Sequence, residues 1–536
     1  MPVSPDQLAD LQADLKVDLL QFAPELILVV TILGLLLSRL VPRFAKVHLA
    51  AVALGGTSAA LFTILAPHFG LLAAPPRDTT AFTGLLALDS FAGFLRTLLL
   101  GFAVLAVLFT RITGIPDAED SADFYTLLLG GILGMMVMVS ANHLLMVFIG
   151  IEMASLPSYA LSGFLKGRRQ GSEAAIKYVV YGAAASGVML YGISLLAGAC
   201  GSGHFPTVAA NLARALQSGA FPPILATGLF FLLVGFAFKL GAVPFHFWVP
   251  DIFEGAAAEV GAFLSVASKA AAVGLTARFL LTIQAATDDP TRLMGTVGLA
   301  VLAVAAITAT FGNLVALAQT NLKRLLAYST IAHAGYMLMA LATLTRDGAA
   351  AVLFYLVAYL LMNLGAFAVV AVVRNRTGAE TIDACRGLLA RSPAVAVALT
   401  VFLLSLLGLP PLAGFAGKFQ VFAAVYEAGQ VYTRHGRPDL GLAFDILLGI
   451  GVLNTVISAG YYLRLLRAAG LDDPVEKDER GEAIPLGEPA EARVFLGVLA
   501  LALIVLGIWW GQLAGYAEKA TKQSFSPLPV GERGRG

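Results

Sequence analysis

Residues 236–251 read FAFKLGAVPFHFWVPD, and this stretch decides how the rest of the chain is interpreted. It continues an apolar run from Phe221 that has the composition of a membrane-spanning helix, yet it contains Lys239, Pro244 and His246. A charge in hydrocarbon costs about 2.5–3.5 kcal/mol, and a proline removes one helical hydrogen bond. Because lipid cannot satisfy the freed backbone groups, the break must face protein or a wet cavity. A broken helix beside a lysine at this depth predicts an ion site more strongly than a kink with a snorkelling lysine.

The composition places the chain in a membrane. Hydrophobic residues make up 58% and charged residues 13%, whereas a soluble domain has about 25% charged residues. The formal net charge of +1 indicates no nucleic-acid partner. The two cysteines, Cys200 and Cys385, form no CxxC or Cys/His cluster, and we find neither GxGxxG nor GxxxxGK(S/T). The sequence therefore predicts an all-α polytopic membrane protein with no redox cofactor of its own.

Roughly fourteen apolar stretches are long enough to cross a bilayer, which takes about 20 residues. The seventh and twelfth contain internal glycine and proline residues, so we expect these two to be discontinuous. The expected spans are Phe22–Leu40, Val47–Ala66, Leu85–Phe109, Tyr125–Ser140, Leu144–Leu165, Ala174–Gly198, Phe221–Phe253, Ala257–Leu281, Leu293–Ala318, Leu325–Leu344, Ala349–Val373, Val395–Val425, Phe444–Leu466 and Phe495–Tyr516.

Lysine and arginine are concentrated in the odd-numbered loops, which predicts that these loops are cytoplasmic. With an even number of spans, both termini are then periplasmic. The charged connector Asp472–Arg493 is expected to be a cytoplasmic loop, and the tail from Ser524 is polar. The basic residues that decide the orientation are Arg43, Lys46, Arg111, Lys166, Arg168, Arg169, Lys323, Arg324, Arg374, Arg376, Arg386, Arg391, Arg467, Lys477 and Arg480, against Arg77, Arg214, Arg292, Arg346, Arg434 and Arg437 in the opposite loops.

The two breaks share a pattern, GxxP, at Gly241–Pro244 and Gly408–Pro411, five spans apart. An odd offset inverts the second copy, and inverted repeats with discontinuous helices are typical of a transport core. We therefore expect two inverted five-helix repeats, made of spans 4–8 and 9–13. The expected parts are an N-terminal three-helix segment (1–120), the first antiporter-like repeat (121–285), the second inverted repeat (286–470), and a cytoplasmic loop with the last helix and polar tail (471–536).

Four ionisable residues lie deep in the predicted spans: Glu152, Lys239, Lys269 and Lys418. A lysine and a carboxylate whose separation varies can load and release a proton, because each changes the proton affinity of the other. Static ion pairing between helices explains the set less well, since one carboxylate cannot neutralise three lysines. These residues are therefore candidates for proton transfer.

Two histidines are weaker candidates. His246 in the break and His333 in the tenth span each have a ring that titrates near neutral pH, so each is a possible proton relay or, equally, a hydrogen-bonded packing residue.

Other polar residues receive structural interpretations. Glu25 is expected to be a helix-start carboxylate, and Asp89 and Arg96 to pair on one face. The tyrosines Tyr328, Tyr336, Tyr355 and Tyr359 are expected to be packing and belt residues, and Lys323 and Arg324 to be positive-inside anchors.

The quoted stretch, AFLSVASKAAAV around Lys269, and Glu152 in E-x-x-SLPSYAL resemble the antiporter-like subunits of respiratory complex I and their relatives in multisubunit cation/proton antiporters. The resemblance covers nearly the whole chain from Pro24. Within the family, SLLGLPPLAGFAGKF most resembles subunit N, the mitochondrial subunit 2 counterpart. One departure is Gly255–Val260, GAAAEV, where Ala257 and Glu259 replace the family's usual prolines. Whether Glu259 joins a proton path or faces the cytoplasm stays open here.

The resemblance implies a proton-translocating subunit of NADH:quinone oxidoreductase in the bacterial inner membrane. It assigns proton transfer to Glu152 with Lys239, then Lys269, then Lys418, with His246 as a relay. NADH, FMN, iron–sulfur clusters and quinone would bind to partner subunits, and subunits K, M, J and A would be membrane partners. The alternative is a subunit of a sodium/proton antiporter with no redox link. An unrelated substrate permease would have the broken helices but does not predict lysine and glutamate at mid-membrane.

Overall fold

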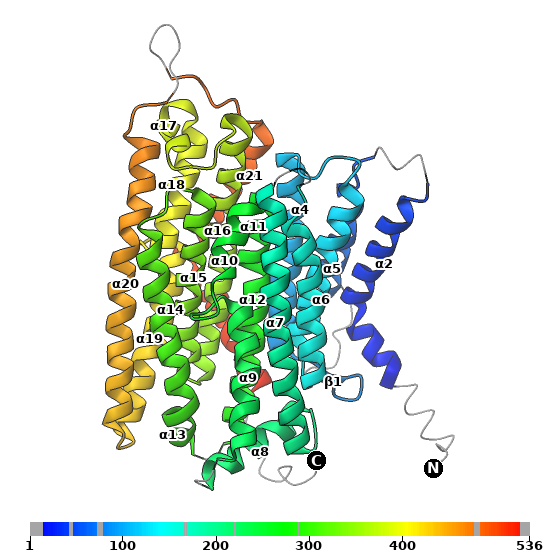
Figure 1. The fold of residues 1–536 in the computed structure, drawn as a ribbon, viewed down its shortest axis with the longest axis vertical. Coiled ribbons are helices and arrows are strands. Elements are labelled where there is room, and N and C mark those ends of the chain that lie inside the picture. The colour runs from blue at the N-terminus through cyan, green and yellow to red at the C-terminus, as the bar shows by residue number, and fades with distance from the viewer. Residues whose placement is uncertain are drawn as a thin grey trace.

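A computed structural model describes residues 14–41, 47–71, 79–165, 167, 169–218, 221–287, 289–475 and 483–525. Most of these residues lie in helices, and the long helices run roughly parallel to one another (Figure 1). Several residues used in the sequence-based predictions lie outside this part: residues 1–13, the tail beyond Phe525, and the basic loop residues Arg43, Lys46, Arg77, Lys166, Arg168, Lys477 and Arg480.

Two short antiparallel strands, β1 (Thr79–Ala81) and β2 (Leu86–Leu88), accompany the helices. The helices are α2 (Ala23–Ser38), α3 (Ala50–Leu65), α4 (Ser90–Thr113), α5 (Ser121–Ser140), α6 (Leu144–Ser162), α7 (Arg169–Cys200), α8 (Phe205–Gln217), α9 (Pro223–Leu240), α10 (Trp248–Gly255), α11 (Ala258–Phe263), α12 (Lys269–Ala285), α13 (Pro290–Leu293), α14 (Leu299–Ala316), α15 (Leu322–Leu341), α16 (Arg346–Thr377), α17 (Leu388–Arg391), α18 (Pro393–Leu407), α19 (Ala413–Arg434), α20 (Pro438–Gly470), α21 (Ala490–Ile508) and α22 (Trp510–Ser524).

Ten helices in the described part are long and apolar enough to cross a membrane, and a bent pair formed by Asp14–Gln21 and α2 makes a possible eleventh. The predicted class, a helical polytopic membrane protein, is confirmed. A helix lies in every one of the expected ranges, but α3 and α18 have only 16 and 15 residues.

The most buried helices stand in the middle of the molecule. The segment Ala258–Ala285 is completely buried over its most apolar window, and Arg346–Thr377 is 89% buried, whereas Arg169–Cys200 is 28% buried. Figure 1 shows α12 and α16 between the N-terminal helix α2 at one edge and α20 at the other. Lys269 therefore begins a helix enclosed by protein on all sides.

Both predicted breaks are present. Helix α9 ends at Leu240 and α10 begins at Trp248, while α18 ends at Leu407 and α19 begins at Ala413. Gly241 and Gly408 follow the two helix ends with φ of 65° and 90°, a left-handed conformation that glycine adopts without steric cost. A π-helical turn, Leu264–Ser268, directly precedes Lys269, and such turns are frequent at functional sites.

Several helices extend a few residues beyond the predicted limits, and two predicted spans differ for an identifiable structural reason. The third begins at Ser90 rather than Leu85, because Leu86–Leu88 pair with β1 and the Asp89 carboxylate caps the helix by accepting from Ala92 N. The span expected over Phe495–Tyr516 is two helices, since α21 ends at Ile508 and α22 begins at Trp510.

The expected pairing of Asp89 with Arg96 is wrong. Arg96 instead binds the buried Glu25 at 2.5 Å, so Glu25 is also more than a helix-start carboxylate. Asp89 accepts from both Nη atoms of Arg278, at 2.7 and 2.8 Å. Sequence spacing could not reveal either partner, because the paired residues come from separate helices.

Candidate functional site

Lys239 lies in the last turn of α9 and is 2% exposed. Its ammonium nitrogen is buried and has no hydrogen-bond partner. The expected partner, Glu152, lies on α6 and accepts a hydrogen bond from Ser186 of α7. No ion pair joins these two residues, so among the residues that the structure describes the buried charge of Lys239 has no counter-charge in contact. A buried polar group of this kind requires an explanation beyond packing.

Lys269 is buried at the start of α12. Its Nζ donates to the carbonyl oxygens of Leu240, at 2.8 Å, and Thr330, at 3.0 Å. Leu240 is the last residue of α9, and carbonyls at a helix end have no partner within the helix. Lys269 therefore connects the first break to helix α15.

Lys418 occupies a similar position at the second break. Its Nζ donates to Leu407 O at 3.0 Å and stands 4.6 Å from the centre of the Tyr336 ring. Leu407 is the last residue of α18. Lys418 is thus held by a helix-end carbonyl and an aromatic face.

His333 lies on α15 with both ring nitrogens near tyrosine hydroxyls. Its Nδ1 is 2.6 Å from Tyr355 Oη, and its Nε2 is 3.3 Å from Tyr462 Oη. Tyr462 Oη is in turn 2.6 Å from Ser329 Oγ. Because hydroxyls and a neutral imidazole can each donate and accept, this cluster can pass a proton along its hydrogen bonds.

A second chain of hydrogen bonds reaches the Lys269 site. Asn363 Nδ2 donates to Ser265 Oγ at 2.7 Å and to Tyr359 Oη at 3.0 Å. Tyr359 Oη donates to Thr330 Oγ1 at 3.0 Å, and Thr330 O is one of the Lys269 acceptors. Polar groups from the π-helical turn Leu264–Ser268, α15 and α16 therefore meet beside Lys269.

The tyrosines are the functional candidates that the sequence-based interpretation missed. Tyr355, Tyr359 and Tyr336, interpreted as packing residues, all contact the buried polar groups. Their spacing carries a partial signal, since Tyr355 and Tyr359 lie four apart and thus share one face of α16. Nothing in the sequence indicates that this face meets His333.

His246 has no such connections. The ring is buried in the break against Phe247 and Phe311, with both centroids at 4.4 Å. Its Nδ1 has no hydrogen-bond partner. His246 therefore lies within the break but is not among the hydrogen-bond partners of Lys269 or Lys418.

Two buried ion pairs surround the α10–α11 junction. Arg374 binds Glu259 at 3.1 Å, so the carboxylate that departs from the family pattern is neutralised from α16. Lys323 binds Glu380 at 2.8 Å and also donates to Ala256 O at 2.7 Å. Lys323 is 1% exposed, so this basic residue of a predicted cytoplasmic loop is also the cation of a buried ion pair.

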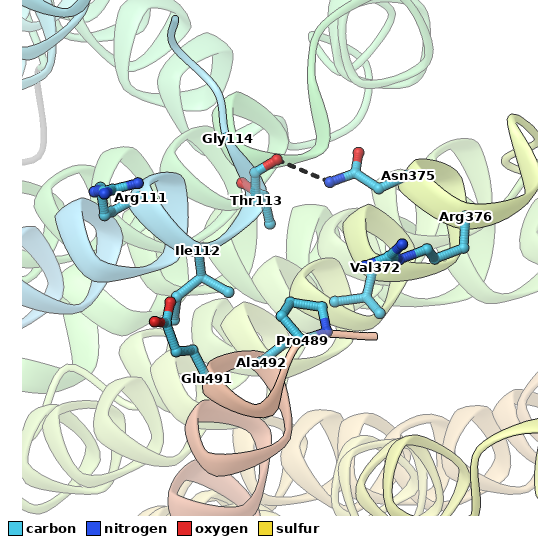
Figure 2. A pocket seen from close by; sticks show the side chains of 10 residues that line it. All are labelled: Arg111, Ile112, Thr113, Gly114, Val372, Asn375, Arg376, Pro489, Glu491 and Ala492. Atoms are coloured by element: carbon cyan, nitrogen blue, oxygen red, sulfur yellow. Dashed lines mark hydrogen bonds between the residues drawn. The ribbon is translucent and has the colours of Figure 1, made fainter. Parts of the chain in front are cut away.

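A separate cavity of about 340 Å³ lies where α4 and α16 end and α21 begins (Figure 2). Asn375 Nδ2 donates to Thr113 O at 2.8 Å across it. None of the candidate site residues lines this cavity, so it is distinct from the buried lysines.

Comparisons with known proteins agree on one family. A family model described as NADH:quinone oxidoreductase/Mrp antiporter, TM matches residues 141–434. NADH-quinone oxidoreductase subunit N of Anaeromyxobacter sp. (strain Fw109-5) is 42% identical over 519 residues, covering 94% of this chain and 97% of the relative.

Solved structures distinguish between the two alternatives, a complex I subunit and an antiporter subunit. A chain of respiratory complex I from Thermus thermophilus is 33% identical, with a TM-score of 0.71 over 92% of this chain and 98% of that one. A chain of the Mrp complex from Dietzia sp. DQ12-45-1b has a TM-score of 0.80, covering 95% of this chain and 98% of that one, at only 19% identity. The Mrp likeness therefore concerns the fold alone, whereas sequence and fold together favour complex I. The chain belongs to the antiporter-like family of NADH:quinone oxidoreductase membrane subunits, which includes the subunit N relative.

Proposed function

We propose that this subunit translocates protons across the membrane when partner subunits reduce quinone with electrons from NADH. Glu152 and Lys239 load the proton, Lys269 is the central carrier, and Lys418 releases it. The observation that carries the proposal is the set of three buried lysines, none of which has a carboxylate in contact in the described part of the chain. Stable folding alone does not explain such charges, because taking an unpaired ion out of water costs several kcal/mol.

In this proposal His333 connects Lys269, the central carrier, to Lys418, which releases the proton. It lies on the same helix as Thr330, which accepts from Lys269, and as Tyr336, whose ring faces Lys418. Tyr355 and Tyr462 then hold the imidazole in place. We assign His333 as the relay between Lys269 and Lys418. His246 is the less favoured relay because its Nδ1 has no partner.

The proposed topology has fourteen spans, with spans 4–8 and 9–13 as two inverted repeats bounded as the sequence predicts. Both breaks follow the same GxxP pattern, which supports the repeat. Asp18 Oδ2 accepts from Phe82 N, and Ser524 Oγ accepts from Phe91 N. These contacts bring the described beginning and end of the chain to one end of the bundle, in keeping with two periplasmic termini in the bacterial inner membrane.

The proposed partners are the other membrane subunits of complex I, with subunits K, M, J and A expected. FMN, the iron–sulfur clusters, NADH and quinone are assigned to partner subunits. Within the described residues no group of three or more His, Cys, Asp or Glu is placed to hold a metal ion.

Variants of Lys418 test the proposed proton translocation. NADH-driven proton uptake is measured in inverted membrane vesicles and normalised to the assembled complex on native gels. Lys418→Ala should lower uptake by roughly tenfold or more, while Lys418→Glu retains more activity because a titratable group remains. Equal loss in both variants, with the complex assembled, would point to a packing role for Lys418.

A further inference from the structure

Both broken helices end with a backbone carbonyl that is bound by a lysine. Lys269 Nζ lies 2.8 Å from Leu240 O and 3.0 Å from Thr330 O. Lys418 Nζ lies 3.0 Å from Leu407 O and 4.6 Å from the Tyr336 ring centre. The carboxyl end of a helix carries a partial negative charge from its unpaired carbonyls. Each ammonium group therefore neutralises the end of a half-helix.

The two lysines reach their carbonyls from different positions in the chain. Lys269 lies in the middle of the span that follows the first broken helix, whereas Lys418 lies in the second half of the broken helix itself. The shared feature is thus the helix end and not the position of the lysine in a repeat. Both breaks therefore have an ammonium group bound at the end of their first half-helix.

Lys323 shows what a structural lysine at a helix end looks like in this chain. It donates to Ala256 O after α10, but it also forms an ion pair with Glu380 at 2.8 Å. Within the described residues, no carboxylate lies within 4.0 Å of Lys269 Nζ or Lys418 Nζ. These two ammonium groups instead contact carbonyl oxygens and an aromatic face.

Those partners are the ones that discontinuous membrane helices and aromatic rings offer to free cations. We propose that Lys269 and Lys418 each fill a monovalent-cation site at the end of a broken helix. The tethered ammonium keeps Na⁺ and K⁺ out of the break and leaves the proton as the mobile charge. This inference rests on the proposed proton translocation and assigns its specificity for protons over alkali cations to these two residues.

Alanine and methionine variants of the same lysine distinguish an emptied cation site from a site that is filled by an uncharged side chain. Lys269→Ala removes the ammonium and leaves the carbonyls facing an open space, whereas Lys269→Met removes the charge but still fills the space. Assembled complex is purified from each, and its melting temperature is followed as NaCl or KCl replaces N-methyl-D-glucamine chloride at constant ionic strength. Binding of ²²Na⁺ is measured on the same samples.

We expect the melting temperature of Lys269→Ala to rise saturably with Na⁺ or K⁺ and ²²Na⁺ to bind, with neither effect in the wild type or in Lys269→Met. Lys418→Ala against Lys418→Met repeats the test at the second break, in case Lys269→Ala does not assemble. Saturable ²²Na⁺ binding by the wild type equal to that of the alanine variants would overturn the inference. So would assembled alanine variants that respond to salt no more than their methionine counterparts.

Failure of the proposed function is recognised separately. NADH-driven proton uptake is measured in wild-type vesicles in Na⁺-free medium, and its absence would contradict the proposed function. This result does not depend on ²²Na⁺ binding by the variants. Proton uptake that requires Na⁺ would contradict both proposals, because the wild type would then admit the ion.

Discussion

Arg278 holds Asp89 with both Nη atoms, at 2.7 and 2.8 Å, and its Nε donates to Val139 O at 3.1 Å. Asp89 starts α4, while Arg278 lies on α12, nine residues after Lys269. The pair therefore fixes the helix of the central lysine against the N-terminal helices. It joins residues 189 positions apart in the sequence.

Removing this pair should destabilise the subunit. Asp89→Ala leaves Arg278 as a buried, uncompensated charge, which costs about 3–5 kcal/mol, and it also removes the cap on Ala92 N. The melting temperature and yield of assembled complex measure the loss. Glu518→Ala, which breaks the exposed pair with Lys522, is the control and should change stability by no more than about 1 kcal/mol. Equal behaviour of the two variants would show that the Arg278 pair does not hold the helices together.

The turn conformation at the first break should also be essential. Gly241 has a φ of 65°, and an added Cβ would lie 2.8 Å from Val249 Cγ2, so Gly241→Ala should lower the yield of assembled, pumping complex. The backbone strain alone is worth about 1–2 kcal/mol. Gly187→Ala is the matched control, because a Cβ there meets no atom within 4 Å. A fully active Gly241→Ala complex would contradict the need for this break.

The polar cluster around His333 should carry protons. Tyr355→Phe removes the hydroxyl 2.6 Å from His333 Nδ1 and should slow NADH-driven proton uptake by roughly tenfold while the complex still assembles. Tyr178→Phe removes a buried hydroxyl without a hydrogen-bond partner and should leave uptake nearly unchanged. If Tyr355→Phe pumps as well as Tyr178→Phe, the proton does not pass through this cluster.

The sequence predicts the buried charges better than their surroundings. Lys239, Lys269 and Lys418 stand out because each interrupts a long apolar run, and the breaks stand out because glycine and proline have strong local preferences. Their partners could not be predicted, since Leu240 O and Leu407 O are backbone atoms that any residue supplies. The partners of Asp89 and Arg96 were missed for a related reason: they depend on which helices pack together, and helical spacing reports only neighbours on one helix.

Topology has a direct test of its own. Asp18 contacts Phe82 in the β1–β2 turn, and Ser524 contacts Phe91 at the start of α4. Because the Lys and Arg distribution predicts periplasmic termini, a C-terminal reporter that is active only in the periplasm should report, and one that is active only in the cytoplasm should not. Cytoplasmic activity alone would reverse the proposed orientation.

Lys239 is proposed to carry a proton and not merely to hold a charge. Lys239→Arg tests it most directly, because arginine keeps the positive charge and can bridge to Glu152 but does not deprotonate in a protein. NADH-driven proton uptake in inverted vesicles, normalised to assembled complex, is the measurement. We predict that the Lys239→Arg complex assembles and loses proton uptake, by roughly tenfold or more, whereas near-normal uptake would contradict the account.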